Sequence, residues 1–179
     1  KGEVIVYTSR QSGSESFDKK WLDNFGVRVI RDASKILLPT PRVVRAVRKV
    51  IKQSKIEKVW FGAAAPLAVS ARFLRVGNVK KIVALSHGHE VWWSKVFPFN
   101  LAMKEIARSV DVLTFLGDYT GSVIGKHFKG RAKLVKIAPG IDINHFKPER
   151  DLSKISEVRS ELKIGSEPLI LSVGRLVHR

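Results

Sequence analysis

The sequence predicts an α/β protein built on an open, mostly parallel sheet with helices on both faces. Short apolar runs rich in β-branched residues alternate along the chain with longer segments of helical periodicity. These runs are apolar almost throughout, as expected of parallel strands that are covered on both sides. Hydrophobic residues make up 44% of the 179 residues, which is enough to form a packed core.

Seven segments have the pattern of strands, and helical patterns lie between them. This repeated strand-then-helix order favours a Rossmann-like sheet with right-handed crossovers. The expected strands are 4–9, 27–32, 58–63, 81–87, 112–117, 133–138 and 169–174.

The clearest helix is expected over 40–55. Thr40 is a good N-cap, and Pro41 suits the first helical position. Valine and isoleucine repeat at helical spacing and should face the sheet, whereas the other side carries six Arg and Lys residues and no acid. This basic side has two explanations, a solvated surface or a ridge that faces phosphates or anionic lipid.

Four further helices are expected, over 66–77, 99–111, 119–130 and 151–164. The turn-rich composition of 139–150 indicates a linker. We therefore expect a first domain over 1–150, and in 151–179 a linker helix with the first strand of a second Rossmann-like domain.

The net charge is +17, from 33 Lys and Arg against 16 Asp and Glu. Such a surface attracts anions, including nucleic acids, anionic lipid headgroups and sugar nucleotides, although a generally basic composition is an alternative explanation. There are no cysteines, which excludes disulfides and thiolate metal sites. No apolar run approaches the roughly 18 residues that a membrane-spanning helix needs.

The stretch SHGHEVWWS (86–94) follows an expected strand. Ligands of open α/β sheets bind beyond the carboxyl ends of the strands, so this position favours a site. Three interpretations remain open here. His87 and His89 bind a metal with Glu90, the histidines only hydrogen-bond loop carbonyls, or His87 faces a substrate. A catalytic zinc needs a third protein ligand, and no other histidine is placed by spacing.

Two later motifs add polar groups. The stretch APGIDINHFKP (138–148) predicts a turn in which Gly140 precedes an exposed Asp142, closed by Phe146 as an apolar anchor. The stretch SVGRL (172–176) presents Arg175 after Gly174 at a strand end, and a guanidinium suits bidentate phosphate binding.

Taken together, these motifs resemble one family. The segments VWFGAAAPLA (59–68), SHGHEVWWS, DVLTFLGDYT (111–120), PGIDINHFKP and SVGRLVHR (172–179) resemble retaining family-4 glycosyltransferases of GT-B architecture. Within that family they are most similar to actinobacterial phosphatidylinositol mannoside mannosyltransferases, which use GDP-mannose. Pro139 departs from the small polar residue that is usual before Gly140.

The resemblance assigns roles to individual residues. His87 would lie against the donor sugar, and Gly174 and Arg175 would hold the donor diphosphate. Gly88, His89, Glu90 and Trp92 would contact the acceptor or shape the loop, and Gly140 and Asp142 would form a turn at the cleft. Neither a nucleophile nor a tightly bound metal or cofactor is expected. The tryptophans could instead form a surface flap or insert at a membrane interface.

The resemblance also implies a longer protein. The run VIVYTSRQ (4–11) matches the family's second strand, so the first strand, its glycine-rich loop and most of the donor pocket are expected outside this sequence. The fragment alone is expected to be inactive. The whole protein would transfer mannose, with retention, to a phosphatidylinositol mannoside-type lipid on the inner face of the plasma membrane.

Two other functions are alternatives to the glycosyltransferase. A non-enzymatic basic Rossmann-like module that binds nucleic acid or other polyanions needs only the charge, but no aromatic-interleaved basic RNA motif is present, so no nucleic-acid partner is expected. A metal hydrolase that uses His87, His89 and Glu90 is the weaker alternative.

Overall fold

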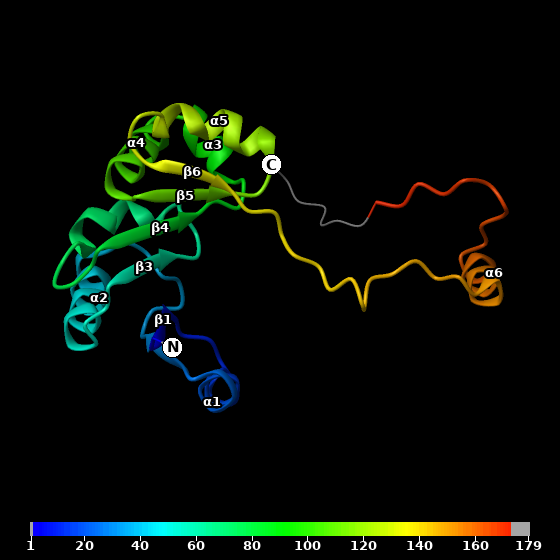
Figure 1. Ribbon diagram of the computed structural model, residues 1–179, viewed down its shortest axis with the longest axis horizontal. Coiled ribbons are helices and arrows are strands. Elements are labelled where there is room, and N and C mark those ends of the chain that lie inside the picture. Colours follow the sequence, from blue (N-terminus) through cyan, green and yellow to red (C-terminus); the bar gives the residue numbers. More distant parts are fainter. Residues whose placement is uncertain (1, 173–179) are drawn as a thin grey trace. The chain divides into compact units, whose positions relative to one another are not determined.

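A computed structural model describes residues 2–172 and confirms the predicted α/β class, with parallel sheets flanked by helices (Figure 1). The chain divides into two compact units, residues 1–139 and 140–179. The first unit contains every described strand, and the second contains one described helix.

The first three elements are two strands that form a small parallel sheet and the helix that connects them. Strands β1 (Val4–Ser9) and β2 (Val27–Asp32) pair in parallel along their whole length. Helix α1 (Glu15–Phe25) connects them and ends at Gly26, whose left-handed conformation (φ 67°) lets its N–H bond the Leu22 carbonyl. This helix was absent from the predicted elements, although its aromatic residues recur every four positions.

The larger sheet has the order β3-β4-β5-β6, and every pair is parallel. Its strands are β3 (Lys58–Phe61), β4 (Lys81–Leu85), β5 (Val112–Phe115) and β6 (Lys133–Lys136). Each strand ends two residues before the predicted position, because the chain turns into a loop at the carboxyl end of the sheet.

The described strands therefore form two sheets, whereas a single open sheet was predicted. Among the described residues, no strand pairing joins β1 or β2 to the four-stranded sheet.

Helices cover the four-stranded sheet. On one side of it are α3 (Glu90–Lys95), α4 (Phe99–Ser109) and α5 (Asp118–Phe128) (Figure 1). The predicted helix at 66–77 is a 3-10 helix, η1 (Leu67–Leu74). The short helix α3 was not predicted, because its six residues are too few to show periodicity.

The core lies between this sheet and its helices. Ala68 and Ala71 of η1 are 0% exposed and permit close approach of η1 to α4. Ile82 and Ala84 of β4 are also 0% exposed and belong to the same core cluster. On the other strands and helices, the large apolar side chains that are fully buried are Met103, Ile106, Leu113, Ile124 and Phe128.

Helix α2 (Pro41–Gln53) confirms the best-defined prediction. Thr40 is its N-cap, and the Thr40 Oγ1 accepts the N–H of Val43 at 3.3 Å. Val43 and Ile51 are buried, as the periodicity requires. The opposite side is basic, but Arg42 is engaged in an ion pair that was not predicted.

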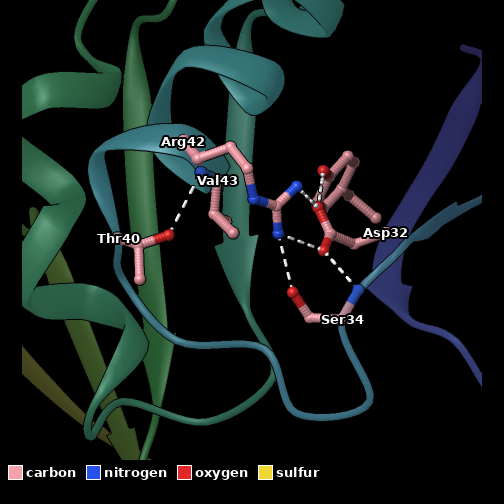
Figure 2. Close-up of polar contacts among 6 residues, drawn as sticks. Asp32, Ser34, Thr40, Arg42 and Val43 are labelled. Carbon is pink, nitrogen blue, oxygen red and sulfur yellow. Dashed lines mark hydrogen bonds and ion pairs between the residues drawn. The ribbon is translucent and has the colours of Figure 1, made fainter.

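An ion-pair cluster ties α2 to the end of β2. Figure 2 shows the Arg42 guanidinium reaching both Asp32 and Ser34. The two bonds between Arg42 and the Asp32 carboxylate measure 2.6 and 3.0 Å. Asp32 is 4% exposed and also accepts the Tyr7 hydroxyl at 2.5 Å and the Ser34 N–H at 2.8 Å. Hydrogen bonds from Arg42, and then from Tyr7, hold the pKa of Asp32 well below its usual range.

The second unit contains α6 (Leu152–Glu161), capped by Asp151, whose Oδ1 accepts the Ser153 N–H at 3.0 Å. The predicted strand at 169–174 does not form in its described part, 169–172. An isolated strand has no neighbour to pair its backbone groups. Gly174 and Arg175 lie outside the described residues. No helix in the described part of the chain is both long enough and apolar enough to span a membrane.

Candidate active site at the carboxyl ends of β3 and β4

The loops that follow β3 and β4 lie side by side. The Ala64 N–H bonds the Leu85 carbonyl at 2.8 Å, and the Ser86 N–H bonds the Thr114 carbonyl on β5 at 2.8 Å. These bonds extend the sheet by one step beyond its ladders and fix the first residues of both loops. The stretch 86–89 is therefore held at the carboxyl edge of the sheet, where the topology predicted a site.

His87 is exposed and is held by a single short bond. Its Nε2 lies 2.6 Å from the Gly62 carbonyl oxygen, in the loop after β3. A carbonyl oxygen can only accept, so Nε2 carries the hydrogen. In the neutral ring, Nδ1 is then a hydrogen-bond acceptor. No described residue bonds this Nδ1, so the geometry leaves one acceptor available to a ligand.

Gly88 gives the loop its turn. Its φ of +99° lies in the region that residues with side chains rarely adopt. Its N–H donates to the Glu90 Oε2 at 3.1 Å. An added Cβ would meet Thr120 Oγ1 of α5 at 3.6 Å, which is ordinary contact. The backbone conformation, and not crowding, therefore requires glycine here.

Glu90 faces into the protein, whereas the side chain of His89 is 48% exposed. The His89 Nε2 lies 3.1 Å from the Ala65 carbonyl oxygen and 3.5 Å from the Glu90 Oε1. Glu90 is 0% exposed and accepts from the Ser86 hydroxyl at 2.9 Å and the Ala65 N–H at 3.4 Å. The carboxylate is engaged within the loops, so it is not placed to contact an acceptor.

Residues 86–89, which we call the histidine loop, are not part of a metal-binding cluster among the described residues. Among residues 2–172, no group of three or more His, Asp or Glu side chains is arranged to hold a metal ion.

The two tryptophans that follow have different environments. Trp92 is 54% exposed, whereas Trp93 packs against the core. Both rings stack on Phe99, with centroids 4.8 and 4.9 Å away. Trp92 remains on the surface beside the site, while Trp93 is a packing residue, so the predicted surface flap is limited to Trp92.

The predicted turn around Gly140 and Asp142 is present in the second unit. Asp142 Oδ1 accepts the N–H groups of Asn144 at 2.9 Å and His145 at 3.3 Å. Phe146 is 67% exposed, so the prediction that it anchors this turn is wrong for the described residues. Its ring meets only the edge of His145, because no described apolar surface of this unit covers it.

The prediction missed the partners of the site residues. The Gly62 and Ala65 carbonyls cannot be inferred from side-chain motifs, and they lie about 25 positions from the histidines that they bond. A signal was available for the cluster in Figure 2, since Asp32 ends a predicted strand and Arg42 lies in the first turn of the next predicted helix.

Comparison with known proteins shows which proteins this chain is related to. No protein-family model matches the chain. It is 36% identical over 177 residues to the GDP-mannose-dependent alpha-(1-6)-phosphatidylinositol monomannoside mannosyltransferase of Mycolicibacterium smegmatis, covering 99% of this chain and 46% of that protein. The protein of the same name from Mycobacterium tuberculosis is 36% identical over 176 residues, 98% of this chain and 45% of that protein.

A third relative has a more specific name. The GDP-mannose-dependent monoacylated alpha-(1-6)-phosphatidylinositol monomannoside mannosyltransferase of Corynebacterium glutamicum is 33% identical over 179 residues, 98% of this chain and 46% of that protein. The chain thus spans about half the length of the curated relatives it matches. The predicted relationship is confirmed: this chain is a homologue of the actinobacterial GDP-mannose-dependent phosphatidylinositol mannoside mannosyltransferases.

Proposed function

We propose that the complete protein transfers mannose from GDP-mannose to a phosphatidylinositol mannoside-type lipid, with retention of configuration. The observation that carries this proposal is the 33–36% identity to mannosyltransferases of that name along nearly the whole chain. The loop that bears His87 supports it, because it lies at the edge of the sheet where α/β proteins bind ligands.

In this proposal, His87 lies against the donor sugar. Its Nε2–H is bound to the Gly62 carbonyl, so Nδ1 is the atom available to a sugar hydroxyl. Breaking the bond between sugar and diphosphate builds negative charge on the diphosphate, and fixed cations or donors stabilise that charge. Gly174 and Arg175 are proposed to hold the diphosphate through the backbone and the guanidinium.

No protein nucleophile is assigned to the retaining reaction. Glu90, the acid nearest in sequence to His87, is 0% exposed and accepts hydrogen bonds from two loops. We propose same-face attack within a close ion pair, without a cofactor or a tightly bound metal. Gly140 and Asp142 are proposed to line the cleft, and Trp92 to contact the acceptor lipid.

We also propose that the protein acts as a peripheral protein on the cytoplasmic face of the plasma membrane. The exposed side of α2 supports this location, because Arg45, Arg48, Lys49 and Lys52 line one shallow hollow. Anionic lipid attracts each basic residue near its surface by about 1 kcal/mol.

The test compares two histidine variants of the complete protein. With GDP-mannose and vesicles that contain mannosylated phosphatidylinositol, His87→Ala should lower mannose transfer by roughly 100- to 1,000-fold, the effect of removing one preorganised polar group. His127→Ala is the matched control, because it also loses a ring-to-carbonyl contact, to Ser94 at 3.2 Å. It should retain activity.

Two outcomes would contradict the proposal at different levels. Undiminished transfer by a folded His87→Ala variant would remove the role of His87. The absence of mannose transfer by the unmodified protein would remove the proposed function itself. The alternative of a polyanion-binding module rests on charge alone, and tight, salt-sensitive oligonucleotide binding that GDP-mannose leaves unchanged would favour it.

A further inference from the structure

The buried carboxylate of Glu90 joins the two loops that make the candidate site. It is 0% exposed, and no Lys or Arg among the described residues pairs with it. Its Oε2 accepts the Ser86 hydroxyl at 2.9 Å and the Gly88 N–H at 3.1 Å, and its Oε1 faces the Ala65 N–H at 3.4 Å. Burying a charge is costly unless hydrogen bonds compensate it, so this arrangement calls for an explanation.

The positions of these donors supply that explanation. Ser86 and Gly88 flank His87 on either side in the loop after β4. Ala65 belongs to the loop after β3, which also supplies the Gly62 carbonyl to which His87 is bound. One carboxylate therefore links the residues on either side of His87 to the loop that carries the Gly62 carbonyl, the partner of His87 in the 2.6 Å bond.

We propose that Glu90 is a positioning residue, which keeps His87 in the Nε2–H tautomer so that Nδ1 accepts from a ligand hydroxyl. This inference rests on the proposed function for its ligand, a sugar that bears hydroxyl groups. Glu90 itself touches no substrate. It acts by setting the distance between the two loops and hence the hydrogen bond that selects the tautomer.

The donor pattern explains why a carboxylate is needed. The Ser86 hydroxyl, the Gly88 N–H and the Ala65 N–H can all donate to Glu90, and an ionised carboxylate accepts at both oxygens. Glutamine presents an NH₂ group on one side. In one orientation this group faces the Gly88 N–H, and in the other it faces the Ala65 N–H. In the first orientation the Gly88 N–H keeps only its 3.4 Å contact with the Ser86 Oγ, and in the second the Ala65 N–H loses its bond to residue 90. Either way, the link that the carboxylate makes between the two loops is weakened.

The experiment uses Glu90→Gln in the complete protein, with two readouts. Nitrogen-15 NMR of the histidine side chains should show His87 as the Nε2–H tautomer in the unmodified protein and as a mixture in the variant. In mannose transfer, kcat should fall by about 10- to 100-fold, with a smaller change in the KM for GDP-mannose, as expected from misplacing a reacting group.

The matched control is Glu105→Gln on α4. Glu105 also accepts from a serine four residues away, the Ser109 hydroxyl at 3.1 Å, but it lies outside both loops. It should leave the His87 tautomer and kcat unchanged. Should Glu90→Gln fail to fold, Ser86→Ala decides the question, because it removes one donor and leaves the charge. Ser86→Ala should likewise convert the Nε2–H tautomer of His87 into a mixture of tautomers.

The outcomes separate this inference from the proposed function. A folded Glu90→Gln or Ser86→Ala variant with the original His87 tautomer and kcat would overturn the positioning role. A shifted tautomer in a protein whose unmodified form transfers no mannose would leave the positioning role standing and remove the proposed function.

Discussion

At the scale of single residues, the backbone of Gly88 sets the shape of the histidine loop. Its φ of +99° is strained for any residue that has a Cβ, although the space around it is open to 3.6 Å. We expect Gly88→Ala to lower the free energy of unfolding by about 1–3 kcal/mol, the usual cost of a residue in such a region. Denaturant unfolding followed by circular dichroism measures this change.

Gly62→Ala is the control for that measurement. Gly62 lies in the partner loop, has no positive φ, and has no atom within 4 Å of an added Cβ. Gly62→Ala should change the free energy of unfolding by no more than about 0.5 kcal/mol, as ordinary surface substitutions do. Equal stabilities of the two variants would show that the backbone conformation at position 88 imposes no strain on a residue with a Cβ.

A second residue-scale prediction concerns alkaline pH. Burial, followed by the hydrogen bond to Asp32 and the charge of Asp32, raises the pKa of Tyr7 to about 12, from an ordinary value of about 10. A raised pKa means that the folded state favours the neutral phenol. The resulting stability is complete below about pH 10 and is lost as the pH rises toward about 12.

Tyr7→Phe tests this prediction. Phenylalanine lacks the ionising hydroxyl, so the stability advantage of the unmodified protein over the variant should shrink between about pH 10 and 12. Urea unfolding of both proteins at several pH values between 8 and 12 would reveal it. An advantage that stays constant across this range would show that the folded protein does not shift this pKa.

The residues of the candidate site could be predicted from the sequence only in part. His87 was expected at a strand end, and it is found there. The burial of Glu90 could not be read from the sequence, because a carboxylate next to a histidine looks the same whether it faces solvent or backbone donors. The distant N–H and C=O groups that bind it come from loops that only the fold brings together.

At the scale of elements, α2 combines a packing side with a basic side. Its N-cap, first-turn proline and apolar spacing are local signals, so 41–53 could be predicted almost to the residue. Helix α1 has equally regular aromatics but no buried residue, and its stacking of Phe17, Trp21 and Phe25 is seen only in the structure.

The basic side of α2 leads to a prediction about membranes. Lys49→Ala combined with Lys52→Ala should weaken binding to anionic vesicles by about 2 kcal/mol, roughly 30-fold, because each lysine near an anionic surface contributes about 1 kcal/mol. Sedimentation with phosphatidylinositol vesicles at low and high salt measures the affinity. Binding should also weaken as salt is added.

A matched charge change on α1 controls for net charge. Lys19→Ala with Lys20→Ala removes the same two positive charges from another exposed helix. This variant should bind the vesicles more tightly than the α2 variant. If both variants lose the same affinity, overall charge and not the ridge on α2 attracts the membrane.

At the scale of the whole molecule, the two units differ in how much they bury. The first contains the core of β4, β5 and their helices, whereas α6 in the second has ten residues and none of them buried. Isolated helices shorter than about 12–15 residues are marginal in water. The second unit therefore has little internal packing of its own.

Hydrogen exchange of this chain should show the difference. The amides of α6 should open with a free energy near zero, while those of Ile82 and Leu113, both 0% exposed, should approach the global free energy of unfolding. Protection of α6 comparable with that of β4 would contradict this prediction. It would indicate that the second unit is stabilised by packing beyond its own contacts.

The fold class, the strands of both sheets, α2 and the relationship to mannosyltransferases could all be predicted from the residues alone. Those features depend on local periodicity, capping and motif order, which the residues carry without reference to distant neighbours. The tautomer of His87, the burial of Glu90 and the pairing of Asp32 with Arg42 follow only from the three-dimensional structure. Each depends on groups brought together from separate loops and strands, since a hydrogen bond needs its partner in place as well as its own residue.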